Sequence, residues 1–282
     1  MANDASSTAM TDPHETNTPG FEHPPVEEVA LCVYVAPLVA VKAVHLGLLW
    51  QEAWAEELPN IEEQPETPAV PLETIESSIQ PLFQFVMGSP VPRVVMSGAN
   101  ETEFVQVQRD RIVHNWRKTN VGEAYPRYRS LKPAFEHDVT RLSEFLGSRS
   151  LGTLQATQCE VAYVNPFTDL KAEDLAELVE PWTGVGSDPF LDSPDDGQIN
   201  LRYPLLDSME RRLGHLYLTV ASVKRQDGQP IVLLTSMARY AVLDEGMSAI
   251  MSALDRAHDA AVRGFVSFTT AAQHREWGGP DA

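Results

Sequence analysis

The spacing of apolar and polar positions changes along the chain, and each spacing predicts a type of element. A run dense in β-branched and aromatic residues over 28–35 predicts a buried strand. Apolar residues spaced three and four apart predict helices over 41–58, 135–146 and 247–268, with a short one over 170–178. Further strands are predicted at 82–87, 93–96, 103–116, 158–167, 199–205, 216–220 and 231–242.

The order of these elements repeats, because each half of the chain reads strand, helix, three strands, helix. With an offset of 129 residues, 33–38 aligns with 162–167 and Lys42 aligns with Lys171. This predicts an internal duplication in which the halves pair edge to edge and so remove two exposed strand edges. The predicted fold class is α+β: a duplicated strand-helix-three-strand-helix unit forming a long curved antiparallel sheet with helices on one face. That layout resembles TATA-binding-like and helix-grip domains.

Composition predicts the boundaries of the parts. Residues 1–24 are rich in Ser, Thr, Asp, Asn and Pro, so we expect a disordered N-terminal tail. The first α+β repeat then spans 25–150 and the second spans 151–282, and the two form one compact unit. Residues 59–77 are acidic and proline-rich and are predicted to form a loop. The sequence leaves open whether this loop folds over the sheet.

Charge and cysteine content narrow the classes of function. The 282 residues include 40 Asp and Glu against 21 Lys and Arg, a net charge of −19. Such a chain repels phosphate backbones and anionic lipids, which disfavours nucleic acid and membranes as partners. No secretory signal or membrane-spanning run is recognisable, and Cys32 and Cys159 lie in apolar runs as expected of buried free thiols. We therefore expect a cytoplasmic protein with no cofactor and no metal; its oligomeric state is open.

The block 93–150 is the only one with a net positive charge, and its strand at 104–117 is unusual. Alternation places Gln106 and Gln108 on one face and Arg109 and Arg111 on the other. Because a half-buried strand normally keeps one face apolar, this predicts a pocket or an interface, or else a solvent face with a polar ladder to the next strand. The candidate ligand- or partner-binding residues are Gln106, Gln108, Arg109, Arg111, Asn115, Trp116, Arg117, Tyr125, Arg127, Tyr128 and Asn165.

Three kinds of partner fit the basic residues of this block. The acidic N-terminal segment could neutralise them within the chain, or their guanidinium groups could bind a small anionic ligand or an acidic protein. Nucleic-acid bases could instead stack on Trp116, Tyr125 and Tyr128. The same tyrosines, with Arg127, are typical of interface anchors but equally of a loop pinned to a sheet.

Motifs of several common enzyme classes are missing from the sequence. There is no G-x-x-x-x-G-K-[ST] phosphate loop and no G-x-S-x-G nucleophile elbow. His274 and Glu276 form an H-x-E string, but the cysteines of a zinc deaminase do not accompany it. Glu160 and Asp110 would form an acid–base pair only if the fold brought them together. No catalytic residue is assigned. The sequence therefore favours a protein that is not an enzyme, but it leaves the question open.

Several strings stand in a fixed order along the chain: QVQRDR at 106–111, NWRK at 115–118, YPRY at 125–128, TQCEVAYVN at 157–165 and HREWG at 274–278. Together they resemble a sporadically distributed, uncharacterised family of bacterial proteins for which no activity is established. The resemblance covers nearly the whole chain from residue 24 and implies an architecture but no mechanism. Sporadic occurrence would suit a role in defence or in a toxin–antitoxin-like pair.

Three functional hypotheses follow. The leading one is a non-enzymatic cytoplasmic binding protein that recognises a protein partner with the curved sheet surface. The alternative is an enzyme or small-molecule binder with a polar pocket between the two repeats, built from Gln106, Gln108, Arg109, Asn165 and Glu160. The second alternative is a nucleic-acid-binding accessory protein, prompted by the TATA-binding-like order of elements.

Overall fold

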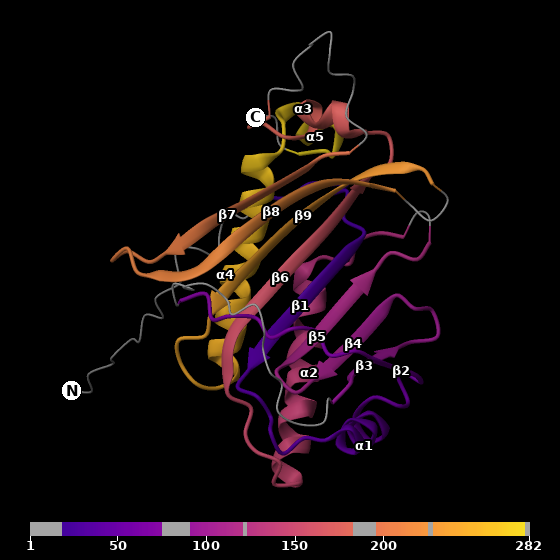
Figure 1. The fold of residues 1–282 in the computed structure, drawn as a ribbon, viewed down its shortest axis with the longest axis vertical. Coiled ribbons are helices and arrows are strands. Elements are labelled where there is room, and N and C mark those ends of the chain that lie inside the picture. The colour runs from indigo at the N-terminus through magenta and orange to yellow at the C-terminus, as the bar shows by residue number, and fades with distance from the viewer. Residues whose placement is uncertain (1–18, 75–90, 121–122, 183–195, 225–227, 280–282) are drawn as a thin grey trace, which may run out of the picture.

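The computed structural model describes residues 19–74, 91–120, 123–182, 196–224 and 228–279. These residues form one curved antiparallel sheet of nine strands, with two long helices on one of its faces (Figure 1), so the predicted α+β class and sheet are confirmed. In sheet order the strands are β2 (Asn60–Gln64), β3 (Arg93–Ser97), β4 (Glu103–Gln108), β5 (Arg111–Arg117), β1 (Glu28–Val35), β6 (Ala156–Phe167), β9 (Pro230–Ala241), β8 (Arg212–Lys224) and β7 (Gln198–Leu206). The helices are α1 (Ala43–Ala53), α2 (Tyr128–Ser148), α3 (Leu175–Leu178), α4 (Met247–Phe268) and α5 (Ala271–Glu276), and a 3₁₀ turn, η1 (Ala172–Asp174), precedes α3.

The strand order is similar in both halves when it is read outward from the middle of the sheet, but among the described residues the first half has four strands between α1 and α2 instead of the predicted three, because β2 extends the sheet beyond β3. The first strand of each half, β1 or β6, lies at the centre, and the last strand, β5 or β9, flanks it. The long helix that ends each half, α2 or α4, lies behind the sheet in the view of Figure 1 and packs on the same face. This arrangement matches the predicted layout, while the duplication itself stays a prediction.

The residue-by-residue alignment at an offset of 129 is wrong for the central strands. β1 pairs with β6 so that Leu31 lies opposite Val161, and residues that lie opposite each other share a face of the sheet. Tyr34 therefore points away from the long helices, whereas Tyr163, its counterpart in the alignment, contacts His258 of α4. Because side chains alternate along a strand, an odd offset here exchanges the two faces.

Two predicted segments are also corrected. The proline-rich segment is not entirely a loop, since 60–64 forms the edge strand β2, which pairs with β3. The segment 103–116 is not one strand but the hairpin β4–β5, which turns at Arg109 and Asp110. Both turn carbonyls are fixed, because they accept hydrogen bonds from the N–H groups of Leu38 and Val35 at 2.9 and 2.8 Å. The strand predicted at 82–87 lies outside the described residues.

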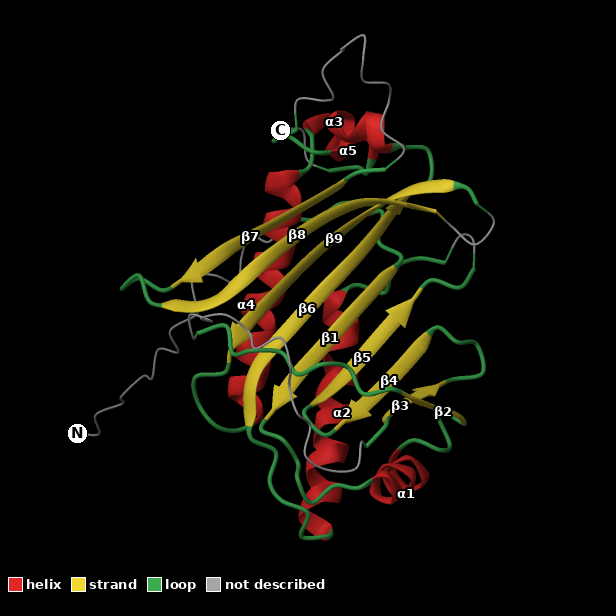
Figure 2. Ribbon diagram, viewed as in Figure 1, coloured by secondary structure: helices red, strands yellow, loops and turns green. Residues whose placement is uncertain are grey.

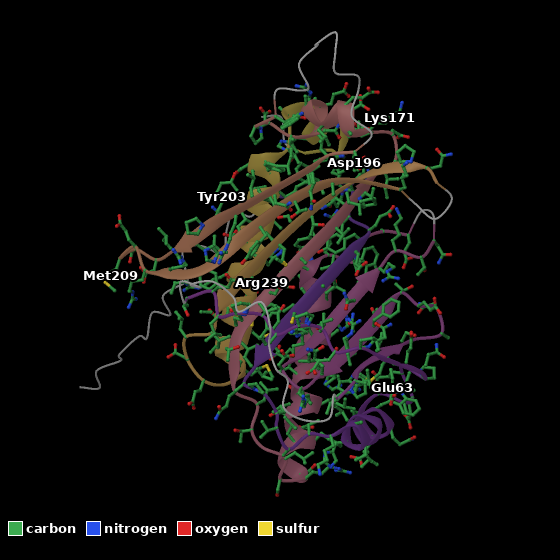
Figure 3. The ribbon with its side chains drawn as sticks, viewed as in Figure 1. Glu63, Lys171, Asp196, Tyr203, Met209 and Arg239 are labelled. Carbon is green, nitrogen blue, oxygen red and sulfur yellow. The ribbon has the colours of Figure 1, made fainter. Side chains whose placement is uncertain are left out.

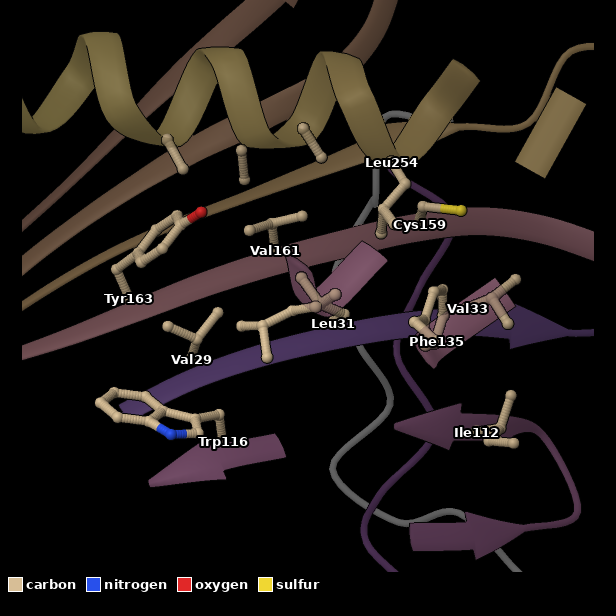
Figure 4. Packing of buried hydrophobic residues seen from close by; sticks show 14 of the residues in the cluster. Val29, Leu31, Val33, Ile112, Trp116, Phe135, Cys159, Val161, Tyr163 and Leu254 are labelled. Carbon is tan, nitrogen blue, oxygen red and sulfur yellow. The ribbon is translucent and has the colours of Figure 1, made fainter. Parts of the chain in front are cut away.

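The core lies between the sheet and the two long helices (Figure 4). Leu31 of β1 and Val161 of β6 meet Phe135 of α2 and Leu254 of α4, and all four are fully buried. Each large side chain buried in this way stabilises the fold by about 2 kcal/mol. Apolar positions at helical spacing thus become the inner stripe of each helix. None of the helices in the described part of the chain combines the length and the apolar character needed to cross a membrane.

The predicted N-terminal tail ends earlier than residue 24. Phe21 is buried, and its ring packs edge-on against Phe265 and Trp277 near the end of the chain. The N–H of His23 donates to the carbonyl of Trp277 at 2.9 Å. The sequence could not predict this boundary, because Phe21 is a single aromatic residue in a segment that is otherwise polar.

Candidate functional site

One face of the sheet is covered by α2 and α4, and we call the other the open face. Polar side chains gather on the open face because β4 and β5 form a hairpin. Across its two-residue turn, Gln108 and Arg111 pair directly and point the same way, whereas in one continuous strand they would point oppositely. The prediction that the glutamines and Arg111 lie on opposite faces is therefore wrong. The open face receives Gln106, Gln108, Arg111, Asn115 and Arg117, and the covered face receives Val105, Val107, Ile112, His114 and Trp116.

At the β3 side of the open face, polar side chains form a ladder across four strands. Arg93 Nη1 donates to Gln106 Oε1 at 2.6 Å, and Gln106 Nε2 donates to Asn115 Oδ1 at 2.7 Å. Asn115 in turn donates to Glu28 at 3.4 Å, and Arg117 pairs with the same carboxylate at 3.4 Å. These residues largely satisfy one another, as the alternative of a polar ladder predicts.

Residues 65–74 cross the open face as an extended coil, which we call the strap; it runs in front of the strands in Figure 2. The N–H and hydroxyl of Thr67 donate to Gln108 Oε1 at 3.2 and 2.9 Å. Arg111 Nη2 donates to the carbonyl of Pro68 at 2.7 Å. The strap also supplies Glu66, which lies 3.7 Å from Arg109. The acidic segment therefore does fold over the sheet and provides partners for these arginines within the chain.

The strap then reaches the second half of the sheet. Gln158 of β6 donates to the carbonyl of Pro71 and accepts the N–H of Glu73, both at 3.2 Å. Of the ten strap residues only Glu73 is buried, while Leu72 is 40% exposed. The strap is therefore held by side-chain contacts and one buried carboxylate rather than by a backbone ladder or an apolar anchor.

The carboxylate of Glu73 is surrounded by four hydrogen-bond donors from three strands. We call this group of four donor side chains the carboxylate site. Its Oε1 accepts from Tyr217 Oη at 2.7 Å and from Arg239 Nη1 at 3.1 Å. Its Oε2 accepts from His215 Nδ1 at 2.6 Å and from Arg202 Nη2 at 3.1 Å. Because Arg202, His215, Tyr217 and Arg239 stand on the hydrogen-bonded strands β7, β8 and β9, the sheet itself positions the donors. Figure 3 shows Arg239 well inside the sheet margins marked by Glu63 and Met209.

The electrostatics of the site favour an ionised carboxylate. Burial opposes the charged form of Glu73, but hydrogen bonds from Tyr217, Arg239 and His215 outweigh it, so the pKa of this carboxyl lies below its usual value. Burial lowers the pKa of His215 despite the neighbouring carboxylate, so this imidazole is neutral at pH 7. Since an ionised carboxylate only accepts, Nδ1 of His215 must carry the proton and donate to Glu73.

Arg239 joins the carboxylate site to a second acid on the central strand. Its Nε donates to Glu160 Oε2, which also accepts from Tyr34 Oη at 3.0 Å. Burial alone would lower the pKa of Arg239, but Glu160, Tyr34 and Glu73 raise it above its usual value. Arg239 therefore stays charged and bridges the two carboxylates.

A small cavity of about 130 Å³ opens beside the strap over β3, β4, β5 and β1, with Glu160 of β6 at one side. A cavity of this size holds about four waters or a molecule of a few heavy atoms. Burial raises the pKa of the Cys32 thiol at its wall, so this sulfur is protonated and is no nucleophile. Its lining residues are Cys32, Tyr34, Thr67, Arg93, Gln106, Gln108, Arg111, Val113 and Glu160.

The aromatic candidates do not reach the open face. Trp116 is 2% exposed and packs against Tyr125, with 5.6 Å between ring centroids. Tyr128 stacks on His258 at 3.9 Å and donates to Asp255 at 2.8 Å, which ties α2 to α4. Trp116 therefore lies in the core, and Tyr125 and Tyr128 pack half-buried against it, as expected of a loop pinned to the sheet. Their role as partner-binding or base-stacking groups stays a prediction.

Three further candidates are also apart from the open-face cluster. Asn165 is buried on the covered side and donates to the carbonyl of Leu234 at 3.0 Å. Arg127 holds the N-terminal segment through the carbonyl of Phe21 at 2.9 Å. Arg109 lies in the hairpin turn at the edge of the strap. The predicted pocket is thus only partly assembled, since Gln106, Gln108 and Glu160 line the cavity but Asn165 and Arg109 do not.

Sequence reasoning missed the whole carboxylate site. It looked for an anion site in the one basic block, whereas the donors come from the acidic second half of the chain. The sequence did contain an indication of this site. His215 and Tyr217 are two positions apart in an otherwise apolar strand, so their polar side chains point to the same face of the sheet. Glu73 stands in a loop whose crossing of the sheet no local pattern reveals.

Comparisons with models of protein families, with curated proteins and with solved structures find no match for this chain. The resemblance to a bacterial family, with its implied role in defence, therefore stays a prediction. Among the described residues, no three His, Cys, Asp or Glu side chains are grouped so that they could hold a metal ion. The site must accordingly be interpreted from its own geometry.

Proposed function

We propose that this chain is a non-enzymatic cytoplasmic binding protein whose open face recognises an extended, acidic segment of a protein partner. The observation that carries the proposal is the strap, because the open face already holds an extended acidic segment of its own chain. The contacts come from side chains of β4, β5, β6, β7, β8 and β9, so they suit a polypeptide laid across the strands.

The charges of the open face support an acidic partner. Arg111, Arg202 and Arg239 each contact a carboxylate, and Arg202 keeps 47% of its side chain exposed. Guanidinium groups bind carboxylates through paired N–H donors, which gives both strength and direction. The net charge of −19 opposes any partner with many negative charges, so the proposal is restricted to a segment in which single carboxylates meet these arginines.

The cavity favours a second candidate, the binding of a small polar molecule. Its wall combines the guanidinium groups of Arg93 and Arg111 with the Glu160 carboxylate, which suits a ligand carrying both an anionic and a cationic group. Native mass spectrometry of the protein from its own host separates the two candidates. A small added mass would support the pocket, whereas a bare chain that binds peptides would support the sheet surface.

The direct test is a selection of random 12-residue peptides on the purified chain. We expect the selected peptides to contain Asp or Glu and to lose at least tenfold in affinity when that residue is changed to its amide. Because Glu73 contacts the same guanidinium group, Arg202→Gln is compared in a Glu73→Ala background, where it should weaken binding by a similar factor.

Arg263→Gln is the matched control for this variant. Arg263 lies on α4, away from the open face, with one ion pair and 48% of its side chain exposed, close to the exposure of Arg202. Binding should be unchanged in this control. If no acidic peptide is selected, or if the Glu73→Ala protein binds equally well with and without Arg202→Gln, the proposed function is wrong.

A further inference from the structure

We propose that the carboxylate site is the position where a partner's acidic side chain binds, and that Glu73 of the strap occupies it as an internal competitor. This inference rests on the proposed function and adds the ligand chemistry and its regulation. The ligand is a carboxylate carried on an extended, proline-containing peptide. Glu73 and its neighbours in the strap are the example of such a ligand that the structure contains.

The four donors of the carboxylate site are positioned by the sheet and do not need the strap to hold them in place. The donors stand on three neighbouring strands, and the pairs Arg202–Tyr217 and His215–Arg239 are cross-strand neighbours in the sheet register. Arg239 is also held by Glu160 from β6. If Glu73 left, these groups would keep their places and present two guanidinium groups to the next carboxylate.

The contacts of the strap with the open face are few, so an external peptide can replace it. Glu73 is its only buried residue, its apolar side chains stay exposed or half-buried, and no strand pairs with it. Its remaining contacts are polar ones that water can replace at small net loss of free energy. One acidic side chain therefore decides whether the strap is seated.

Competition within the chain has a predictable size. A tethered ligand acts at an effective concentration of about 1 mM or more, so it suppresses the binding of an external ligand of micromolar affinity by orders of magnitude. Removing the Glu73 carboxylate should therefore raise the affinity for an external acidic peptide. Removing a strap carboxylate that does not enter the site should leave that affinity unchanged.

The probe is a labelled synthetic peptide of residues 64–74, QPETPAVPLET, and its binding is measured by fluorescence polarisation. We expect Glu73→Ala to bind it at least tenfold more tightly than the unchanged protein does, and Glu73→Gln to lie in between. The same peptide with its second Glu changed to Gln should bind at least tenfold more weakly to Glu73→Ala. Adding Arg202→Gln to Glu73→Ala should remove the gain.

Glu66→Ala is the matched control, because Glu66 lies in the strap with one ion pair at 3.7 Å and should bind the probe like the unchanged protein. Circular dichroism and thermal melting establish that each variant is folded. Equal binding of the probe by a folded Glu73→Ala and the unchanged protein would overturn the competitor role. That result would leave the proposed function standing if randomly selected acidic peptides still depend on Arg202, whereas failure of both experiments would remove both.

Discussion

The covered face and the open face belong to the same strands, yet they accommodate buried polar groups in different ways. On the covered face the polar groups form short sets between a strand and a helix: His114 Nδ1 lies 2.8 Å from Asp138, which also accepts from Trp54 at 2.8 Å, while Nε2 of His114 has no hydrogen-bond partner. On the open face the carboxylate of Glu73 collects donors from three strands and belongs to a coil that no strand pairs with.

We infer that this difference separates groups that stabilise the fold from groups that bind a partner. A polar pair between a strand and a packed helix joins elements that the core already holds together, so it serves the fold. A carboxylate brought to a sheet by a coil completes a site that the sheet positions by itself, so another carboxylate can take its place. The predictions below test whether the two faces do differ in this way.

The largest effect is expected in the core of the covered face. Leu254 of α4 is fully buried, so Leu254→Ala should lower the free energy of unfolding by about 3 kcal/mol through lost burial and a remaining cavity. Leu48→Ala in α1 is the matched control, since Leu48 is 42% exposed and its loss should change stability by less than about 1 kcal/mol. Urea denaturation measures both. Similar losses for the two variants would contradict the assignment of the core.

An effect that reaches a similar size only at the acid end of the range is expected on the same face. Burial between the helices lowers the pKa of His258 from 6.5 to about 4, although Asp255 and Asp259 oppose this. Between these values the unfolded chain binds a proton that the folded chain excludes, so stability should fall as the pH drops from 6.5 toward 4. The full loss is roughly 3 kcal/mol.

Urea denaturation at steps from pH 7 to pH 4 follows this loss. His258→Asn, which cannot titrate, should flatten the curve over this window relative to the unchanged protein. His137→Asn in α2 is the control, since His137 is exposed and its replacement should leave the slope as it is. An unaltered slope in His258→Asn would show that another group causes the acid sensitivity.

The smallest effect on stability is expected on the open face. Glu73 has a pKa below its usual value of 4.5, so its ionised form stabilises the folded chain above that pH, and this contribution is lost as the pH falls through the lowered value. Glu73→Gln should therefore cost about 1 kcal/mol at pH 7 and remove part of the acid dependence below pH 4.5.

Hydrogen exchange makes the comparison of the faces sharper. In Glu73→Gln the backbone amides of residues 67 and 73, which donate to the side chains of Gln108 and Gln158, should exchange faster. The backbone amides of the sheet should exchange at the same rate as in the unchanged protein. Faster exchange throughout β8 and β9 would mean that Glu73 is part of the fold rather than a replaceable ligand.

Much of the architecture could be predicted because burial patterns are local. The run at 28–35 and the helical spacing at 247–268 each correspond to an element with nearly the expected bounds. The hairpin at 103–117 could not be predicted, because its turn residues, Arg109 and Asp110, carry no glycine or proline signal. That one turn reversed the expected faces of half the strand, and with them the predicted site.

The sequence by itself determined the types and order of the elements, the α+β class and the acidic charge that disfavours nucleic acid. These properties follow from the spacing of apolar residues and from the composition, which can be read from residues close together in the sequence. Only the tertiary structure decided which polar residues meet, because strand register and a loop crossing bring Glu73 within hydrogen-bond reach of residues more than a hundred positions away. Such contacts depend on how the strands pair and where a coil crosses the sheet, which no local pattern records.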